Sequence, residues 1–91
     1  MKNPSENKLL EEKNRKAEIL EALSKTLPRI IVRSELDRMS PRIVSSGRMA
    51  NEDSRGTGVP GMFYIGRKAC YSREAFLGWI EERLRFPEAR S

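Results

Sequence analysis

SSGRMANEDSRGTGVPGMFYIGRKACY, residues 45–71, is the stretch that decides the fold of this chain. Ser45 is a favourable N-cap for a helix over residues 46–55. Gly56 follows that helix and is suited to the left-handed backbone conformation that often ends one. Met49 and Ala50 supply the small apolar inner side of the helix, with Asp53 near its far end. The outward positions are expected to include Ser46, Gly47, Arg48, Asn51, Glu52 and Arg55.

A β-hairpin is predicted directly after this helix. Residues 57–61 (TGVPG) predict a loop, because two glycines and a proline do not hold regular structure. Two short β-type runs, at 62–65 and 69–71, then flank Gly66, Arg67 and Lys68. The sequence therefore predicts a tight hairpin with a basic tip.

Upstream, a short apolar run and a second helix are expected to pack against this unit. Residues 29–32 (RIIV) predict a brief strand or an extended lead-in. Ser34 is placed to cap a short helix that ends at Ser40-Pro41, with Leu36 and Met39 directed to the core.

The N-terminal third predicts one long helix. Residues 1–4 are expected to be disordered, Ser5 to cap the helix, and Pro28 to stop it after Leu27. Three leucines follow three-then-four spacing in its second half: Leu20, Leu23 and Leu27. This stripe predicts either docking on the domain or pairing with a second copy of the chain, and we favour the second.

A last helix is predicted from its Ser72 cap to about Leu84 or Arg85. Its apolar stripe is Phe76, Leu77, Ile80 and Leu84, with Trp79 beside it. Four aromatic residues are expected in the core, since the domain has few other large side chains, whereas Tyr64 is expected to be exposed and Cys70 half-buried. These four are Phe63, Tyr71, Phe76 and Trp79.

The predicted fold class is mostly α with a small β-hairpin. Two short helices followed by a two-stranded wing describe a winged helix-turn-helix, here with an added N-terminal helix. The expected domains are an N-terminal extension at 1–28, the winged helix-turn-helix at 29–86 and a tail at 87–91.

Composition excludes several classes of function. The net charge is +5, and residues 29–91 hold twelve basic and eight acidic side chains against six and five in residues 1–28. No apolar run is long enough for a membrane span or a signal peptide, which predicts a cytoplasmic protein. With no His and a single Cys, we expect no zinc site, no intrachain disulfide, no cofactor and no enzymatic activity.

The helix over residues 46–55 has the size and the side chains that fit a DNA major groove. Arg48 is suited to guanine N7 and O6, and Asn51 to adenine N6 and N7. Ser45 and Ser46, with the free N–H groups of the helix, are suited to a phosphate. Glu52 is predicted either to accept from a cytosine amine or to pair with Arg48 one turn away.

Arg67 and Lys68 at the hairpin tip are expected to contact the phosphate backbone or an adjacent minor groove. Arg55 is expected on the outward face of the helix. The predicted partner is therefore double-stranded DNA.

The chain also resembles a known family, through residues whose spacing covers about positions 30–84. Small winged helix-turn-helix proteins of prophages and integrative elements, described as excisionase-like or AlpA-type regulators and related in fold to MerR-type domains, share this pattern. The resemblance implies sequence-specific DNA binding without catalysis, either to regulate transcription or to bend DNA beside an integrase. It assigns Ser54 and Arg55, with Arg48 and Asn51, to the recognition helix, and Arg67 and Lys68 to the wing. The matching residues are Ala50-Asn51, Asp53–Gly56, Gly58, Pro60, Ile65–Lys68, Tyr71–Glu74 and Trp79–Glu81.

An alternative function is a protein-interaction adaptor that reuses the winged-helix fold. Glu52 and Asp53 favour it, because acidic side chains are unfavourable on a surface that meets DNA. Possible protein partners are a second copy of the chain through the N-terminal helix, an integrase, or RNA polymerase.

Overall fold

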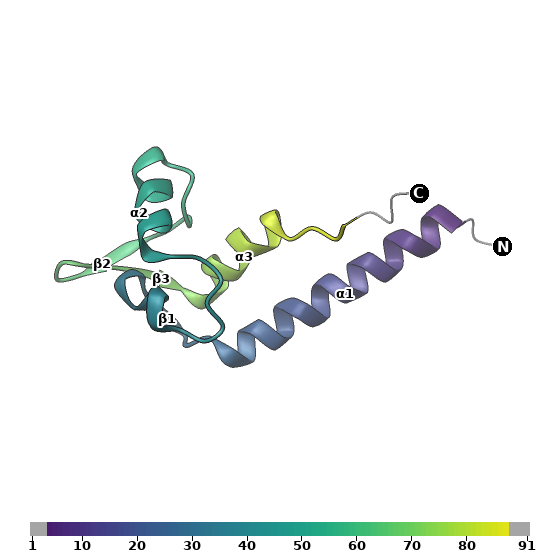
Figure 1. The fold of residues 1–91 in the computed structure, drawn as a ribbon, viewed down its shortest axis with the longest axis horizontal. Helices are drawn as coiled ribbons and strands as arrows, with labels where there is room; N and C mark the ends of the chain where they lie inside the picture. Colours follow the sequence, from purple (N-terminus) through teal and green to yellow (C-terminus); the bar gives the residue numbers. More distant parts are fainter. Residues whose placement is uncertain (1–3, 88–91) are drawn as a thin grey trace.

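The computed structural model describes residues 4–87, with side chains from residue 8 onward. It is mostly helical, with one small antiparallel sheet (Figure 1). The elements follow one another as α1 (Pro4–Thr26), β1 (Ile30–Val32), the 3-10 helix η1 (Arg33–Arg38), α2 (Ser46–Arg55), β2 (Phe63–Ile65), β3 (Lys68–Ser72) and α3 (Arg73–Arg83).

The sheet has three strands in the order β1-β3-β2, with both pairs antiparallel. The RIIV run is thus a strand, and it pairs Ile31 with Tyr71 in β3. On the other side of β3, Ile65 pairs with Lys68, so Gly66 and Arg67 alone form the hairpin turn. Gly66 has a φ of 63°, which explains a glycine there. Lys68 is the first residue of β3 and not part of the turn, contrary to the three-residue tip predicted from sequence.

Cys70 is buried and not half-buried as predicted, with 1% of its surface exposed. The reason is that β3 is the middle strand, and Cys70 has a paired neighbour on each side, Val32 and Phe63. Phe63 lies on the edge strand β2 and is only partly buried, so the prediction that it belongs to the core is wrong. Tyr64 is 59% exposed, as predicted.

The short helix after β1 differs from its prediction in type and in its cap. It is a 3-10 helix that starts at Arg33, directly after the strand, so that Val32 occupies the cap position and makes no side-chain cap hydrogen bond. Ser34 lies inside the helix and does not cap it. Such a 3-10 run of six residues is longer than most, because the hydrogen-bond geometry of a 3-10 helix is poorer than that of an α-helix. Leu36 still enters the core, as predicted.

The core lies between the sheet, α3, η1 and the end of α1. Tyr71 and Phe76 are stacked with ring centres 6.0 Å apart, and Phe76 and Trp79 with centres 6.5 Å apart. Phe76 is thus the centre of this stack, and Trp79, 3% exposed, is one end of it. Ser72 caps α3, accepting a hydrogen bond from the Ala75 N–H at 3.1 Å.

The long helix docks on its own domain through the end predicted to pair with a second copy. Leu27 is 3% exposed and belongs to the core, and Leu20 and Leu23 pack against it. Arg73 donates to the Leu27 carbonyl at 3.2 Å, which ties α3 to this end of α1. Toward the N-terminus α1 extends away from the sheet (Figure 1), and Leu9 is 65% exposed.

Two terminal predictions fall largely outside the described residues. Of residues 1–4, predicted to be disordered, the structure describes only Pro4, which is the first residue of α1. Of the predicted tail at 87–91 it describes only Pro87. No helix within residues 4–87 is long and apolar enough to cross a membrane.

Candidate nucleic-acid interface

Helix α2 stands at one end of the molecule beside the hairpin (Figure 1). The Ser45 hydroxyl accepts from the Arg48 N–H at 3.1 Å, and Gly56 ends the helix with a φ of 78°. Both ends are as predicted. Met49 is fully buried, and Asp53 lies four residues later on the same inner side.

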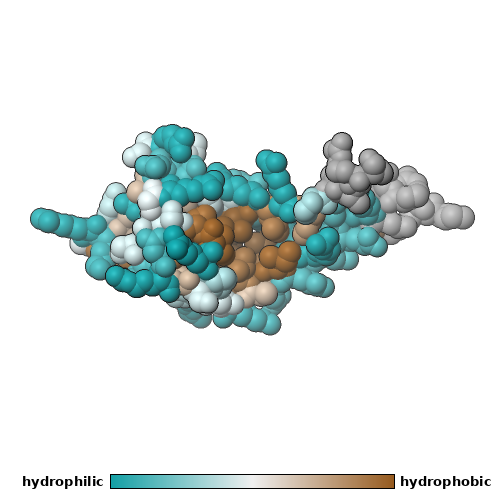
Figure 2. Space-filling model, viewed as in Figure 1, coloured by the Kyte–Doolittle hydropathy of each residue, from teal (hydrophilic) through white to brown (hydrophobic). Residues whose placement is uncertain are grey.

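The outward arc of α2 brings together the recognition-helix residues predicted from sequence. Asn51 lies on the side opposite Met49, because residues two positions apart in a helix are separated by about 200° around its axis. Asn51 and Ser54 are exposed, and the side chains of Arg48 and Arg55 are 58% and 69% exposed. Figure 2 shows hydrophilic residues over this part of the molecule, with an apolar area nearer its middle. The surface of α2 is therefore suited to a polar partner.

A hollow of about 320 Å³ joins α2 to the hairpin. Gly47 on α2 and Arg67 and Lys68 on the hairpin, twenty positions away in sequence, border the same depression. Gly47 has open space around the position of a Cβ, so packing within the chain does not require a glycine there. The lining residues are Arg33, Ser34, Ser46, Gly47, Ala50, Arg67, Lys68 and Ala69.

Arg33 is a cation of this hollow that sequence reasoning missed. It follows β1 and donates to Asp53 Oδ2 at 2.8 Å, and this hydrogen bond raises the pKa of Arg33. Tyr71 donates to the same oxygen at 2.6 Å. No local pattern in the sequence connects these three positions, which lie 18 and 20 residues apart.

The Asp53 carboxylate is therefore a buried anchor and not part of the exposed surface. Its side chain is 7% exposed. Gly58 is required beside it, because a Cβ at that position would collide with the carboxylate. Burial, followed by the hydrogen bond to Asp53, raises the pKa of Tyr71, so the phenol ionises only at a higher pH than an exposed tyrosine.

Glu52 pairs with Arg48, one of the two alternatives that the sequence left open. Its Oε2 lies 3.6 Å from Arg48 Nε and 3.8 Å from Arg55 Nη2. Its Oε1 accepts from the Thr57 hydroxyl at 2.5 Å. That hydrogen bond is the main cause that lowers the pKa of Glu52, with smaller contributions from Arg55 and Arg48.

The two serines at the start of α2 already have partners inside the chain. Ser45 caps the helix, and Ser46 donates its N–H and hydroxyl to Asp37 at 3.0 and 2.6 Å. These bonds lower the pKa of Asp37, and Arg42 lies 3.8 Å from the same carboxylate. A carboxylate thus occupies the place where the sequence predicts a phosphate, and phosphate contact by Ser45 and Ser46 stays a prediction.

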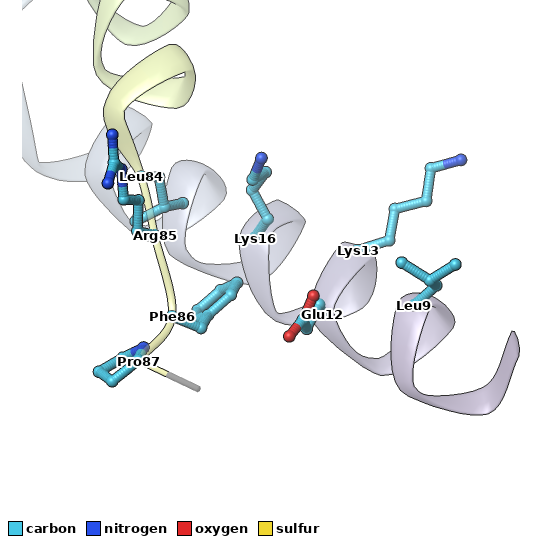
Figure 3. A pocket seen from close by; sticks show the side chains of 8 residues that line it. All are labelled: Leu9, Glu12, Lys13, Lys16, Leu84, Arg85, Phe86 and Pro87. Carbon is cyan, nitrogen blue, oxygen red and sulfur yellow. The ribbon is translucent and has the colours of Figure 1, made fainter. Parts of the chain in front are cut away.

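A second hollow, of about 920 Å³, lies at the far end of the molecule between α1 and the segment after α3 (Figure 3). The Arg15 guanidinium lies 4.2 Å from the centre of the Phe86 ring within this region. The hollow shares no lining residue with the one beside α2. Its lining is Leu9, Glu12, Lys13, Lys16, Leu84, Arg85, Phe86 and Pro87.

Comparison with protein families, with curated proteins and with solved structures finds no match to this chain. The functional argument therefore depends on the residues and geometry described above.

Proposed function

We propose that this chain is a sequence-specific DNA-binding protein with the winged helix-turn-helix arrangement. In this proposal η1 and α2 are the helix pair, and β2 with β3 is the wing. The observation that supports it most is the hollow that joins α2 to the hairpin. The hollow brings Ser46, Gly47 and Ala50 of α2 beside three cations, Arg33, Arg67 and Lys68. Arg48, Asn51 and Arg55 do not line it and lie on the exposed surface of the same helix.

In the proposed complex α2 enters the major groove, which accepts one helix. Arg48 reads guanine and Asn51 reads adenine, while Arg55 and Ser54 extend the contact along the groove. Arg67 and Lys68 bind the phosphate backbone or reach an adjacent minor groove.

The proposed role within this class is that of a cytoplasmic transcriptional regulator or an excisionase-like recombination directionality factor, as in the family that the sequence resembles. Its protein partner would be RNA polymerase in the first case and an integrase in the second. A gel-shift assay with the binding site at different positions along a DNA fragment separates the two, because a directionality factor bends its site and a simple operator binder need not.

The adaptor alternative loses its main support. It depended on Glu52 and Asp53 as acidic groups on the binding surface. In the structure Asp53 is buried against Arg33 and Tyr71, and Glu52 is paired with Arg48 and with Arg55.

We also propose a homodimer through α1, now limited to the first half of the helix. Leu20, Leu23 and Leu27 are used within the chain, which leaves Leu9 and Leu10, 65% and 44% exposed, for pairing. Sedimentation of the Leu9→Lys variant tests this, with a shift from dimer to monomer as the expected result.

Fluorescence anisotropy with random duplex DNA tests the DNA-binding proposal. Affinity should fall by orders of magnitude from about 50 to about 200 mM salt, since each phosphate contact releases counterions. Arg67→Ala should weaken binding to all sequences alike, whereas Asn51→Ala should relax preference at one base pair. Lys13→Ala is the matched control, because it removes one positive charge at the far end of α1. Absence of binding at low salt would refute the proposal.

A further inference from the structure

Glu52 has an unusual place for an acidic residue on a helix that reads DNA. It lies between two exposed arginines, Arg48 four residues before it and Arg55 three residues after it. Its side chain is only 13% exposed, because Glu52 lies about 60° around the helix from the buried Met49 and not opposite it. The two arginines flank Asn51, which lies at the centre of the arc.

The carboxylate is fixed by the core rather than by the arginines alone. Thr57 donates its N–H to the Glu52 carbonyl at 2.9 Å and its hydroxyl to Glu52 Oε1. The carbonyl of Thr57 in turn accepts from the buried Trp79 Nε1 at 2.9 Å. A polar chain therefore runs from the centre of the core to the outer face of α2.

The contacts of Glu52 leave the arginines free to bind. At 3.6 and 3.8 Å they are ion pairs and too long for hydrogen bonds, so no N–H of either guanidinium is consumed. Arg48 faces the carboxylate with Nε, which leaves both terminal nitrogens for a guanine edge. The carboxylate thus lies close to both guanidinium groups without occupying their donors.

We propose that Glu52 is a positioning residue for DNA readout, which holds Arg48 and Arg55 for guanine and disfavours other sequences. This inference depends on the proposed DNA-binding function. Side chains held in place before binding lose less conformational freedom on binding a matching site. At a site without guanine, the carboxylate remains as a negative charge close to the phosphates, which weakens binding.

The geometry predicts that removal of the Glu52 charge changes the affinity for random and for matching DNA by different amounts. Without the charge of Glu52, electrostatic attraction to any duplex increases, because Arg48 and Arg55 are no longer partly neutralised. A matching site gains less, since the arginines are then no longer positioned for it. The ratio of affinities for matching and random DNA should therefore decrease.

The experiment selects a preferred site from a random duplex library with the wild-type chain. Affinities for this site and for random duplex are then measured for wild type, Glu52→Gln and Glu81→Gln. Glu81 is an exposed residue of α3, so its variant changes the net charge equally. For Glu52→Gln the specificity ratio should fall by about tenfold and selection for guanine should weaken, with random-duplex affinity increased. Glu81→Gln should leave the ratio unchanged.

Thr57→Val provides a second variant that keeps the charge of Glu52 and removes its hydroxyl anchor. It should lower the specificity ratio without the gain in random-duplex affinity. Three results would each overturn the inference and leave DNA binding intact. The specificity ratio of Glu52→Gln could equal that of Glu81→Gln, the ratio of Thr57→Val could equal that of wild type, or the selected site could lack guanine. A wild-type chain that binds no duplex at low salt would instead overturn the proposed function.

Discussion

Replacing Asp53 with Asn should destabilise the fold far more than a surface substitution. The Asp53 carboxylate is 7% exposed and accepts from Arg33 and Tyr71 through one oxygen, at 2.8 and 2.6 Å. Asn has nearly the same shape and can keep a neutral acceptor at that place. What it removes is the negative charge that strengthens both hydrogen bonds and balances Arg33.

The size of the loss follows from these contacts. A hydrogen bond to a charged group contributes about 1 kcal/mol more than one between neutral groups, which gives about 2 kcal/mol for two bonds. The cation of Arg33 also loses its partner, although its side chain is 26% exposed and water replaces part of the interaction. We expect the free energy of unfolding to fall by about 2–3 kcal/mol, or roughly 10–20 °C in Tm for a domain of this size.

Urea titration and thermal melting followed by circular dichroism measure this change. Glu81→Gln serves as the control for loss of a surface carboxylate and should shift stability by less than about 0.5 kcal/mol. Tyr71→Phe should cost about 1–2 kcal/mol, because it removes one bond and keeps the Arg33–Asp53 pair. A loss for Asp53→Asn no larger than that of Glu81→Gln would refute the anchoring role of the carboxylate.

Three further outcomes follow from the same structure. Leu27→Ala should lower the free energy of unfolding by about 2–5 kcal/mol in urea titration, because Leu27 is 3% exposed, whereas the exposed Leu9→Ala should change little. The pKa of Tyr71 is raised in the fold, so its contribution to the free energy of unfolding is complete below about pH 10 and is lost at higher pH. In thermal melts at alkaline pH, Tyr71→Phe should therefore lose less stability with rising pH than wild type does, whereas the exposed Tyr64→Phe should behave like wild type. Gly47→Ala should leave Tm unchanged or slightly raised, since its Cβ meets open space, yet weaken random-duplex binding in anisotropy if DNA approaches this turn closely. Equal binding by Gly47→Ala and wild type would exclude close approach there.

Local signals in the sequence predicted the elements that depend on neighbouring residues. Ser45 and Ser72 both cap helices, and Gly56 ends α2 in the left-handed conformation, as expected. Each of these features is determined within a few residues, so it can be recognised without knowing the rest of the fold. The same holds for the Gly66 turn, apart from the place of Lys68.

Features that depend on distant residues were not predicted. Burial of Cys70 requires β1 to pair with the far side of β3, and the RIIV run alone does not show this. The end of α1 docks because the domain offers a partner for Leu27, which the leucine spacing cannot distinguish from a dimer. Arg33 belongs to the candidate site because it pairs with Asp53, which lies 20 positions away in the sequence.

The acidic residues of α2 show what composition alone does not reveal about this helix. Counted along the sequence, Glu52 and Asp53 argue equally against DNA. In the fold they are separated by about 100° around the helix, so Asp53 points inward to a buried pair and Glu52 lies against two arginines. Both carboxylates are therefore paired with side chains of the chain itself.

This arrangement also determines what orients α2. Met49 is the only residue of α2 that is fully buried and apolar, and among the described elements α2 packs closely only against η1. Apolar contact is not directional, so one buried methionine cannot fix the rotation of a ten-residue helix. The directional contacts are polar. Ser46 bonds to Asp37 at the start of the helix. In its last part, Asp53 bonds to Arg33 and Tyr71, and Glu52 bonds to Thr57. If the chain binds DNA as proposed, we expect Asp53→Asn and Thr57→Val each to alter DNA selectivity at temperatures where circular dichroism shows the domain still folded, because each removes a contact that fixes the rotation of α2 and leaves the aromatic core unchanged.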